Sequence, residues 1–247
     1  MDETDIHLRI APELRFFLPS GRRHDDWQQA PVDGTSSLGH VVESLGIPLT
    51  EVGPMTVGGS GVGPSYQPRP GDAVDVAPVP RPQPLAEEPR FLLDVHLGTL
   101  ARRLRLLGID TAYHNDMDDP SLVVQANAER RVLLTQDRGL LRRRALWLGA
   151  YVRGTKAESQ LEDLLDRFAP PLRPWTRCTS CNGELTQVAK SEVAPSLPDG
   201  TRRGYDAYGR CRECGQVYWR GAHSGHLEEI VQSCLDRRTH LSSSELG

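Results

Sequence analysis

Aspartates follow three short apolar segments in the middle third of the chain. One acid ends the first segment, three follow the second and one follows the third: Asp94, Asp116, Asp118, Asp119 and Asp137. If these segments are strands of an open parallel sheet, their carboxyl ends meet at the edge where such sheets bind ligands. Carboxylates crowded at that edge repel one another, and a hard divalent cation relieves the repulsion. The pattern therefore predicts a Mg²⁺ or Mn²⁺ site that can activate water for attack on a phosphate.

A purely structural interpretation is open for part of this group. Asp119 precedes Pro120, so it can be a helix N-cap followed by proline at the first helical position. Asp116 and Asp118 can be ordinary loop residues. Asp94 and Asp137 directly adjoin apolar segments. A purely structural role is less convincing for an acid in that position than for the other three.

The cysteines predict a second metal site. Four of the five form two C-x-x-C pairs: Cys178, Cys181, Cys211 and Cys214. Two such pairs can close a tetrahedral Zn²⁺ site, and four thiolates leave no open position, so we expect a structural metal rather than a catalytic one. Two disulfides or free thiols are the alternatives, but the absence of a secretion signal favours the metal.

The elements that must position these residues indicate an α/β chain of several domains. An alternating apolar segment, a helical pattern at 36–46 and later short strands predict a β-grasp, ubiquitin-like domain. The middle third alternates strand and helix patterns, as in a parallel sheet with covering helices. Proline-rich breaks separate the parts. The expected boundaries are a ubiquitin-like domain at 1–80, a Pro-rich linker at 81–88, the α/β domain at 89–170, a zinc ribbon at 171–235 and a disordered tail at 236–247.

Composition excludes some classes of protein. The 247 residues are 38% hydrophobic and 25% charged, as in ordinary globular chains. No apolar stretch reaches the roughly 18 residues of a membrane span, and the first ten residues do not resemble a secretion signal, so we expect a cytoplasmic protein without a membrane partner. The net charge of −4 arises in the first third, where residues 1–84 carry 11 acidic and 6 basic side chains. The rest of the chain can therefore still bind a polyanion.

Several segments together resemble a known family. The stretch 119–137, DPSLVVQANAERRVLLTQD, resembles the end of PIN-like nucleases: an acid seven residues before an alanine, then an apolar strand, Thr and Asp. With LLDVHLGTLARRLRLLGIDTAY, the cysteine pairs and VYWRGAH, the chain resembles the Mut-seven C-terminal ribonuclease family, a PIN-like group with a zinc ribbon. HVVESLGIPLTEV and the GDAVDV turn resemble the ubiquitin-like domain often fused ahead of it.

The resemblance implies metal-dependent hydrolysis of RNA phosphodiester bonds by a PIN-like nuclease domain at 89–170. By motif position it implies Asp94, Asp119 and Asp137 as Mg²⁺ or Mn²⁺ ligands. A fourth ligand is implied among the acids before Asp119, at Asp116 or Asp118. The chain departs from the family pattern at three positions near these acids: His96, Thr99 and Gln136. These departures affect expected substrate contacts and rate, but they leave the acids in place.

Arginines are the candidate contacts with RNA, because guanidinium forks bind phosphate oxygens and neighbouring aromatic rings stack on unpaired bases. One group follows the last aspartate and the other lies in the ribbon: Arg138, Arg142, Arg143, Arg144, Arg212 and Arg220. A solvated basic face is the alternative interpretation of both groups.

The expected function is that of a cytoplasmic ribonuclease that uses catalytic Mg²⁺ or Mn²⁺ and structural Zn²⁺. Its partners would be RNA, with tRNA and ribosome-associated RNA as candidates, and a protein bound by the ubiquitin-like domain. The alternative is a non-catalytic RNA- or ribosome-binding adaptor that retains the PIN-like fold.

Overall fold

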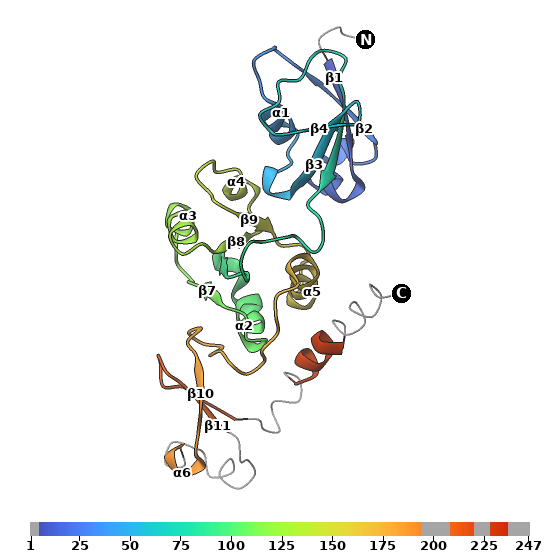
Figure 1. Ribbon diagram of the computed structural model, residues 1–247. Coiled ribbons are helices and arrows are strands. Elements are labelled where there is room, and N and C mark those ends of the chain that lie inside the picture. The colour runs from blue at the N-terminus through green and yellow to red at the C-terminus, as the bar shows by residue number, and fades with distance from the viewer. Residues whose placement is uncertain (1–4, 194–207, 220–227, 237–247) are drawn as a thin grey trace. The chain divides into compact units, whose positions relative to one another are not determined.

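The computed structural model describes residues 5–193, 208–219 and 228–236 (Figure 1). It forms two compact units, each built from segments that are distant in the sequence. The first unit consists of Met1–Leu85, Asp118–Arg153 and Asp166–Phe168. The second unit consists of Ala86–Met117, Gly154–Leu165 and Ala169–Gly247. The domain boundaries expected from the sequence divide the chain in another way and stay a prediction.

A five-stranded mixed sheet and one helix form the N-terminal part of the first unit (Figure 1). The strands run in the order β2-β1-β5-β3-β4, with the bounds Asp5–Ile10 (β1), Trp27–Pro31 (β2), Val52–Val57 (β3), Ser60–Val62 (β4) and Ala73–Pro78 (β5). β1 pairs antiparallel with β2 and parallel with β5. Its alternate residues Ile6, Leu8 and Ile10 are buried in one core with residues of α1 (Leu38–Ser44). This arrangement confirms the predicted ubiquitin-like fold.

Short elements complete this region. Ser37 caps α1, because its Oγ accepts a hydrogen bond from the backbone N–H of His40 at 3.3 Å. Three 3-10 helices connect the strands: η1 (Pro12–Phe17), η2 (Ser20–Arg22) and η3 (Leu49–Glu51).

The middle of the chain forms the predicted parallel sheet. Its four strands have the order β7-β6-β8-β9, with the bounds Phe91–Leu93 (β6), Thr111–Tyr113 (β7), Val132–Thr135 (β8) and Gly149–Tyr151 (β9). β6 pairs parallel with β7, and β8 pairs parallel with β9. The helical elements are η4 (Val95–Leu97), α2 (Gly98–Leu106), α3 (Asp119–Ala128), α4 (Arg138–Leu141) and α5 (Ala157–Phe168). All residues of β6, β8 and β9 are buried, as their short apolar sequences predict.

The C-terminal part of the second unit is an antiparallel ribbon. Its three strands have the order β10-β11-β12, with the bounds Leu185–Val188, Tyr208–Cys211 and Val217–Trp219. The helix α6 (Lys190–Val193) follows β10, and a further helical segment is described at 228–236. Val193 and Tyr208 form a small apolar core. A core of this size gives little stability alone, so a ribbon of this kind depends on other bonds.

One hydrophobic core in the first unit extends from the ubiquitin-like sheet into the segment α4–β9. Leu141 of α4 and Tyr151 of β9 both belong to it. The ring of Tyr151 meets that of Phe17 edge-on, with 5.1 Å between the centroids. The ubiquitin-like fold is therefore packed against α4 and β9 of the parallel-sheet region and is not joined to them by the chain alone.

A buried ion pair reinforces this packing. Nη1 of Arg167 lies 2.9 and 2.8 Å from the two carboxylate oxygens of Glu51, and the two side chains are 0% and 2% exposed. The backbone N–H of Tyr151 also donates to Glu51 Oε1 at 2.8 Å. Arg167 donates further to Gln83 Oε1 and to the carbonyl oxygen of Thr50. Both charges are thus compensated by several hydrogen bonds.

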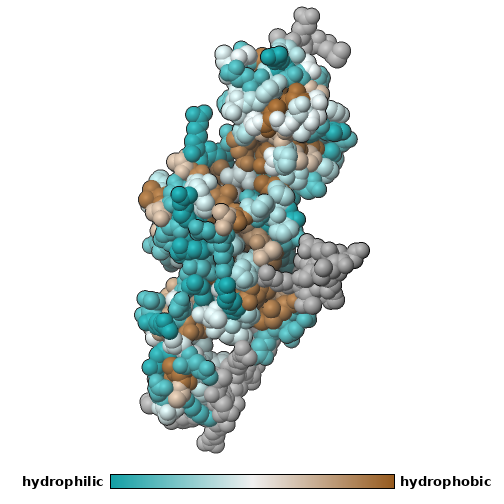
Figure 2. All heavy atoms as spheres, in the orientation of Figure 1, coloured by the Kyte–Doolittle hydropathy of each residue, from teal (hydrophilic) through white to brown (hydrophobic). Residues whose placement is uncertain are grey.

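The surface is mixed in character. In the face shown in Figure 2, apolar residues form separate patches among polar ones. No helix in the described part of the chain combines the length and the apolar character that a bilayer crossing requires.

Candidate metal centres and arginine surface

The four paired cysteines lie together in the second unit. Their sulfur atoms are all within 4.8 Å of one another. Cys178 Sγ is 3.7 Å from Cys214 Sγ, and Cys181 Sγ is 3.4 Å from Cys211 Sγ. Sulfurs placed tetrahedrally at about 2.3 Å from Zn²⁺ are separated by about 3.8 Å, whereas a disulfide bond is only about 2.05 Å long. The spacing fits a zinc site rather than two disulfides.

Each cysteine pair lies in a tight backbone turn of the same design. In the first turn, Asn182 N–H donates to the carbonyl oxygen of Cys178, and in the second, Gly215 N–H donates to that of Cys211. Asn182 and Gly215 both have positive φ values, 73° and 75°. Asn and Gly are the residues that adopt this conformation most readily. The residues that follow each cysteine pair thus favour a tight turn, and this turn brings the two sulfur atoms of the pair to the same cluster.

The acid–base properties of the thiols favour a cation at this cluster. Burial raises the pKa of Cys178, but hydrogen bonds from Tyr218 Oη and from backbone amides outweigh it and lower the pKa to about 6. Desolvation raises the pKa of Cys181 to about 12. Thiolates crowded at one point repel one another, and a divalent cation supplies the counter-charge that relieves this repulsion.

A buried arginine joins the first cysteine turn to α2 and β7 of the same unit. Arg105 of α2 is 3% exposed and donates to the carbonyl oxygens of Thr111, Thr179 and Ser180 at 2.8, 3.2 and 2.7 Å. Burial lowers the pKa of Arg105, while the charges of nearby cysteine thiolates raise it. Asn182 adds two bonds, to Thr111 N–H and to the carboxylate of Asp110. Nothing in the sequence marks this role, because a basic residue off the apolar face of a helix is expected to be exposed.

The predicted catalytic acids stand at the starts of helical elements. Asp94 follows β6 and caps η4, with its Oδ1 accepting from Val95 N–H at 2.6 Å. Asp116 is exposed in the loop after β7. Asp118 caps α3 by accepting from Ser121 N–H at 2.9 Å, and its hydrogen bonds with Ser121 lower its pKa.

Helix α3 begins one residue earlier than the sequence predicts. Asp118 is the N-cap, and Asp119 is already inside the helix. The carboxylate of Asp119 therefore does not cap α3. Its Oδ2 lies 3.4 Å from Nη2 of Arg143, and both side chains are nearly half exposed.

Asp137 caps α4 with one of its two carboxylate oxygens. Oδ1 accepts from the backbone N–H groups of Gly139 and Leu140 at 2.6 and 3.3 Å. Oδ2 makes no hydrogen bond among the described residues, and Asp137 is exposed. Gln136, one of the departures from the family pattern, donates to the carbonyl oxygen of Val152 at 2.9 Å and so has a structural role.

The predicted acids are divided between the two units. Asp119 and Asp137 belong to the first unit, and Asp94 and Asp116 belong to the second. Within the described residues, the cysteine cluster is the only group of three or more metal-ligating side chains with ligand atoms within 4.8 Å of one another. A cation site shared by the aspartates stays a prediction.

The arginines proposed for RNA binding have different environments. Arg138 donates to the carbonyl oxygens of Phe17 and Phe16 at 2.8 and 3.2 Å, and its guanidinium lies over both rings at 5.1 and 5.0 Å. These contacts of Arg138 all lie inside the first unit. None of them supports RNA binding by Arg138, which stays a prediction. Arg142 and Arg144 are exposed.

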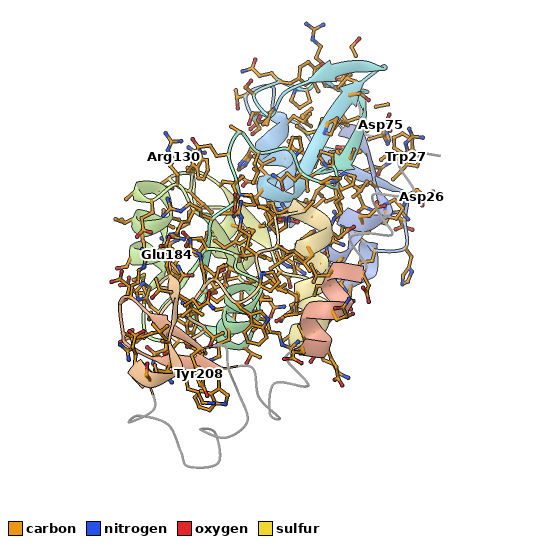
Figure 3. The ribbon with its side chains drawn as sticks, turned by 60° about the horizontal axis from the view of Figure 1, so that its bottom comes forward. Asp26, Trp27, Asp75, Arg130, Glu184 and Tyr208 are labelled. Carbon is orange, nitrogen blue, oxygen red and sulfur yellow. The ribbon has the colours of Figure 1, made fainter. Side chains whose placement is uncertain are left out.

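In the ribbon, Arg212 is exposed and lies 3.4 Å from a carboxylate oxygen of Glu184. Figure 3 labels Glu184 on this ribbon together with Tyr208. Arg220 lies outside the described residues. Of the arginines proposed for RNA binding, the exposed ones nearest in sequence to a predicted catalytic acid are therefore those that follow α4.

Comparisons with known proteins give two matches. Residues 89–231 match the family model of the Mut7-C RNAse domain, and residues 3–84 match that of Mut7-C ubiquitin. No curated protein and no solved structure matches the chain. The first match covers more than half of the 247 residues and spans both the predicted catalytic acids and the four cysteines.

Proposed function

The chain belongs to the Mut7-C RNase domain family and carries a Mut7-C ubiquitin domain ahead of the RNase domain, and from this membership we propose a metal-dependent ribonuclease. The observation that carries the proposal is the match of residues 89–231 to an RNase family model. A ribonuclease acts on RNA, so RNA is its substrate, with tRNA and ribosome-associated RNA as candidates. We also propose that the enzyme works in the cytoplasm.

In this proposal, Asp94, Asp119 and Asp137 hold the catalytic cation. Two local features support it: the carboxylate of Asp119 does not cap a helix, and Asp137 keeps one oxygen outside its capping bonds. Asp118 uses its carboxylate to cap α3, which favours Asp116 as a fourth ligand. When bound, Mg²⁺ or Mn²⁺ would lower the pKa of a water molecule and offset charge on the phosphate. Carboxylate oxygens suit both of these hard ions.

Zinc has a structural role in the proposal. Four thiolates complete its coordination and leave no position for a substrate. The metal would fix the two cysteine turns to each other, and Arg105 of α2 holds the first of them. The ribbon arginines Arg212 and Arg220, together with Arg142, Arg143 and Arg144, would contact phosphates. The ubiquitin-like domain would present a surface to a protein partner.

RNA cleavage by matched variants tests the proposal. Purified protein with Mn²⁺ should cleave RNA, and Asp137→Asn should reduce the rate by more than roughly a hundredfold, because it removes an anionic ligand of a charge-stabilising cation. Asparagine also caps helices well, so α4 should keep its start. Asp25→Asn, at an exposed loop position, is the control and should cleave as the wild type does.

A non-catalytic adaptor gives another result. If wild type and Asp137→Asn bind RNA equally and neither cleaves it in Mg²⁺ or Mn²⁺, the nuclease proposal is wrong and the adaptor function replaces it.

A further inference from the structure

An exposed tryptophan next to the arginine-rich segment has a cation on its ring. Trp147 is 46% exposed, which is unusual for a large aromatic residue in a globular protein. The guanidinium carbon of Arg130 lies 5.2 Å from the centre of its ring, within the range of a cation–π contact. An aromatic ring held by an arginine and still exposed offers a surface for stacking.

The backbone holds this pair in place. Asn127 of α3 donates from Nδ2 to the carbonyl oxygen of Ala145 at 2.6 Å, and its Oδ1 accepts from Trp147 N–H at 2.8 Å. One side chain thereby fixes the loop on both sides of residue 146. The ring of Trp147 is thus presented by an anchored loop rather than by a free one.

Arg130 occupies a position that favours another residue type. It follows the end of α3 with a φ of 52°, the left-handed conformation in which glycine is the usual residue after a helix. A residue with a side chain is strained there. An arginine at this position is explained if its guanidinium is needed over Trp147.

The charge of the surrounding segment suits an anion. Residues 138–156 contain six basic side chains and no acidic one. Arg142 and Arg144 are exposed, and neither forms an ion pair within the part of the chain that the structure describes. Arg143 pairs with Asp119 at 3.4 Å, a surface contact of little strength that a phosphate can replace.

The same helix links the tryptophan to a predicted catalytic acid. Asp119 and Asn127 lie eight residues apart in α3, which is about 12 Å along the helix axis. A short single-stranded segment spans this distance. A strand with one base at Trp147 is therefore able to extend along α3 towards Arg143 and Asp119.

We propose that Trp147 and Arg130 form a stacking site for an unpaired RNA base, while Arg142 and Arg144 bind the flanking phosphates. The proposal rests on the proposed ribonuclease function and deepens it: the substrate is single-stranded at this site. A paired base would keep its faces in the helix stack and could not lie on the ring, whereas splayed bases of single strands stack on aromatic residues in this way.

The protein contains a matched control for this site. Trp27 of β2 is 47% exposed, and the guanidinium of Arg9 lies 5.8 Å from its ring centre. However, Arg9 is paired with Asp75 at 2.5 Å, and Asp26 adjoins the tryptophan in sequence. Figure 3 shows Asp26, Trp27 and Asp75 together on one side of the first unit, well separated from Arg130. Acidic neighbours repel phosphate, so this second tryptophan should not bind RNA.

Fluorescence anisotropy of a labelled single-stranded RNA oligonucleotide tests the proposal on the full-length, zinc-containing protein. Binding is measured without added Mg²⁺ or Mn²⁺, so the result does not depend on cleavage. Trp147→Ala should weaken binding roughly five- to hundredfold, as for loss of one stacked base. Trp147→Phe should recover most of the affinity, and Trp27→Ala should match the wild type. None of these variants should change affinity for a fully paired duplex.

A second variant covers the case in which Trp147→Ala does not fold. Arg130→Gly suits the local backbone conformation and removes the guanidinium, so it should fold and weaken binding about two- to fivefold. Unchanged affinity in Trp147→Ala, or in Arg130→Gly if the first variant is unfolded, overturns the stacking site and leaves the ribonuclease proposal standing. Equal losses on single-stranded and duplex RNA also overturn it. Failure of the wild type both to bind and to cleave RNA overturns both proposals.

Discussion

The two candidate metal centres are built in opposite ways. The four cysteines come from two short turns within one compact unit, and each turn closes on its own backbone. The aspartates come from segments of both units. Asp94, Asp118 and Asp137 cap separate helical elements, whereas Asp119 makes a surface contact and Asp116 is exposed in a loop. A metal site built from local motifs can be predicted from the spacing of its ligands in the sequence. A site built from dispersed acids cannot, because its geometry depends on how the whole domain packs.

A buried arginine reinforces each unit in a comparable manner. Arg105 holds the first cysteine turn against α2, and Arg167 holds Glu51 of the ubiquitin-like fold. Each arginine lies on a helix of the RNase domain. Arg105 donates hydrogen bonds to carbonyl oxygens of the ribbon, and Arg167 donates to the buried carboxylate of the ubiquitin-like domain. The ribbon and the ubiquitin-like domain are therefore anchored parts of the structure.

The largest expected effect is the loss of zinc when one of the four paired cysteines is replaced. Cys211→Ser should lower the zinc content from one ion per chain to near zero, since a site with three thiolates and a hydroxyl binds Zn²⁺ weakly. Because zinc binding contributes about 10–16 kcal/mol to folding in small zinc domains, the ribbon should unfold. Metal analysis and limited proteolysis measure both effects. Cys234→Ser, at the fifth cysteine, is the control, and equal zinc loss in it would contradict the assignment.

The next effect concerns the anchoring of the ubiquitin-like domain. Glu51→Ala leaves the buried charge of Arg167 uncompensated and should lower the free energy of unfolding by about 3–5 kcal/mol. Asp75→Ala breaks an exposed pair with Arg9 and should cost less than about 1 kcal/mol. Chemical denaturation followed by circular dichroism compares the two. If both variants lower the free energy of unfolding by similar amounts, the ion pair of Glu51 with Arg167 does not stabilise the first unit.

A smaller effect is expected at the corresponding arginine of the second unit. Arg105→Leu removes the donor to three carbonyl oxygens and should cost about 1–3 kcal/mol. Because the cysteines remain, zinc should still bind at one ion per chain. Arg102→Leu, at an exposed position of the same helix, should leave stability nearly unchanged. Complete loss of zinc in Arg105→Leu would mean that the two turns cannot form without this anchor.

The smallest effect probes the surface pair beside the predicted catalytic acids. Arg143→Gln should change stability by less than about 1 kcal/mol, because both partners are nearly half exposed. If Asp119 binds the catalytic cation, loss of the competing guanidinium should tighten Mn²⁺ binding by less than about fivefold. A calorimetric Mn²⁺ titration measures this change. Weaker Mn²⁺ binding would indicate that the pair positions Asp119 rather than competing for it.

Much of this architecture was predictable because it follows local patterns. Alternation in β1, the all-apolar strands of the parallel sheet and the two C-x-x-C pairs each determine structure over a few residues. The observed start of α3 differs from the predicted start by one residue. Asp118 and Asp119 can both cap a helix, and only the packed structure selects one of them.

Contacts between distant segments were not predictable. Glu51 and Arg167 are separated by 116 positions, and no local pattern marks either as buried. Trp147 was missed for a related reason. Its importance arises from Asn127 of α3 and from Arg130, which follows that helix, and the sequence shows only a single tryptophan after three arginines.

We propose that the aspartates, and not the cysteines, supply the catalytic metal site. The most direct measurement is the Mn²⁺ dependence of RNA cleavage by zinc-loaded wild type and by Asp94→Asn, Asp119→Asn and Asp137→Asn, with zinc content determined for each. We predict that every variant retains one zinc ion per chain and loses Mn²⁺-dependent cleavage. Cleavage at the wild-type rate by all three variants would contradict the account.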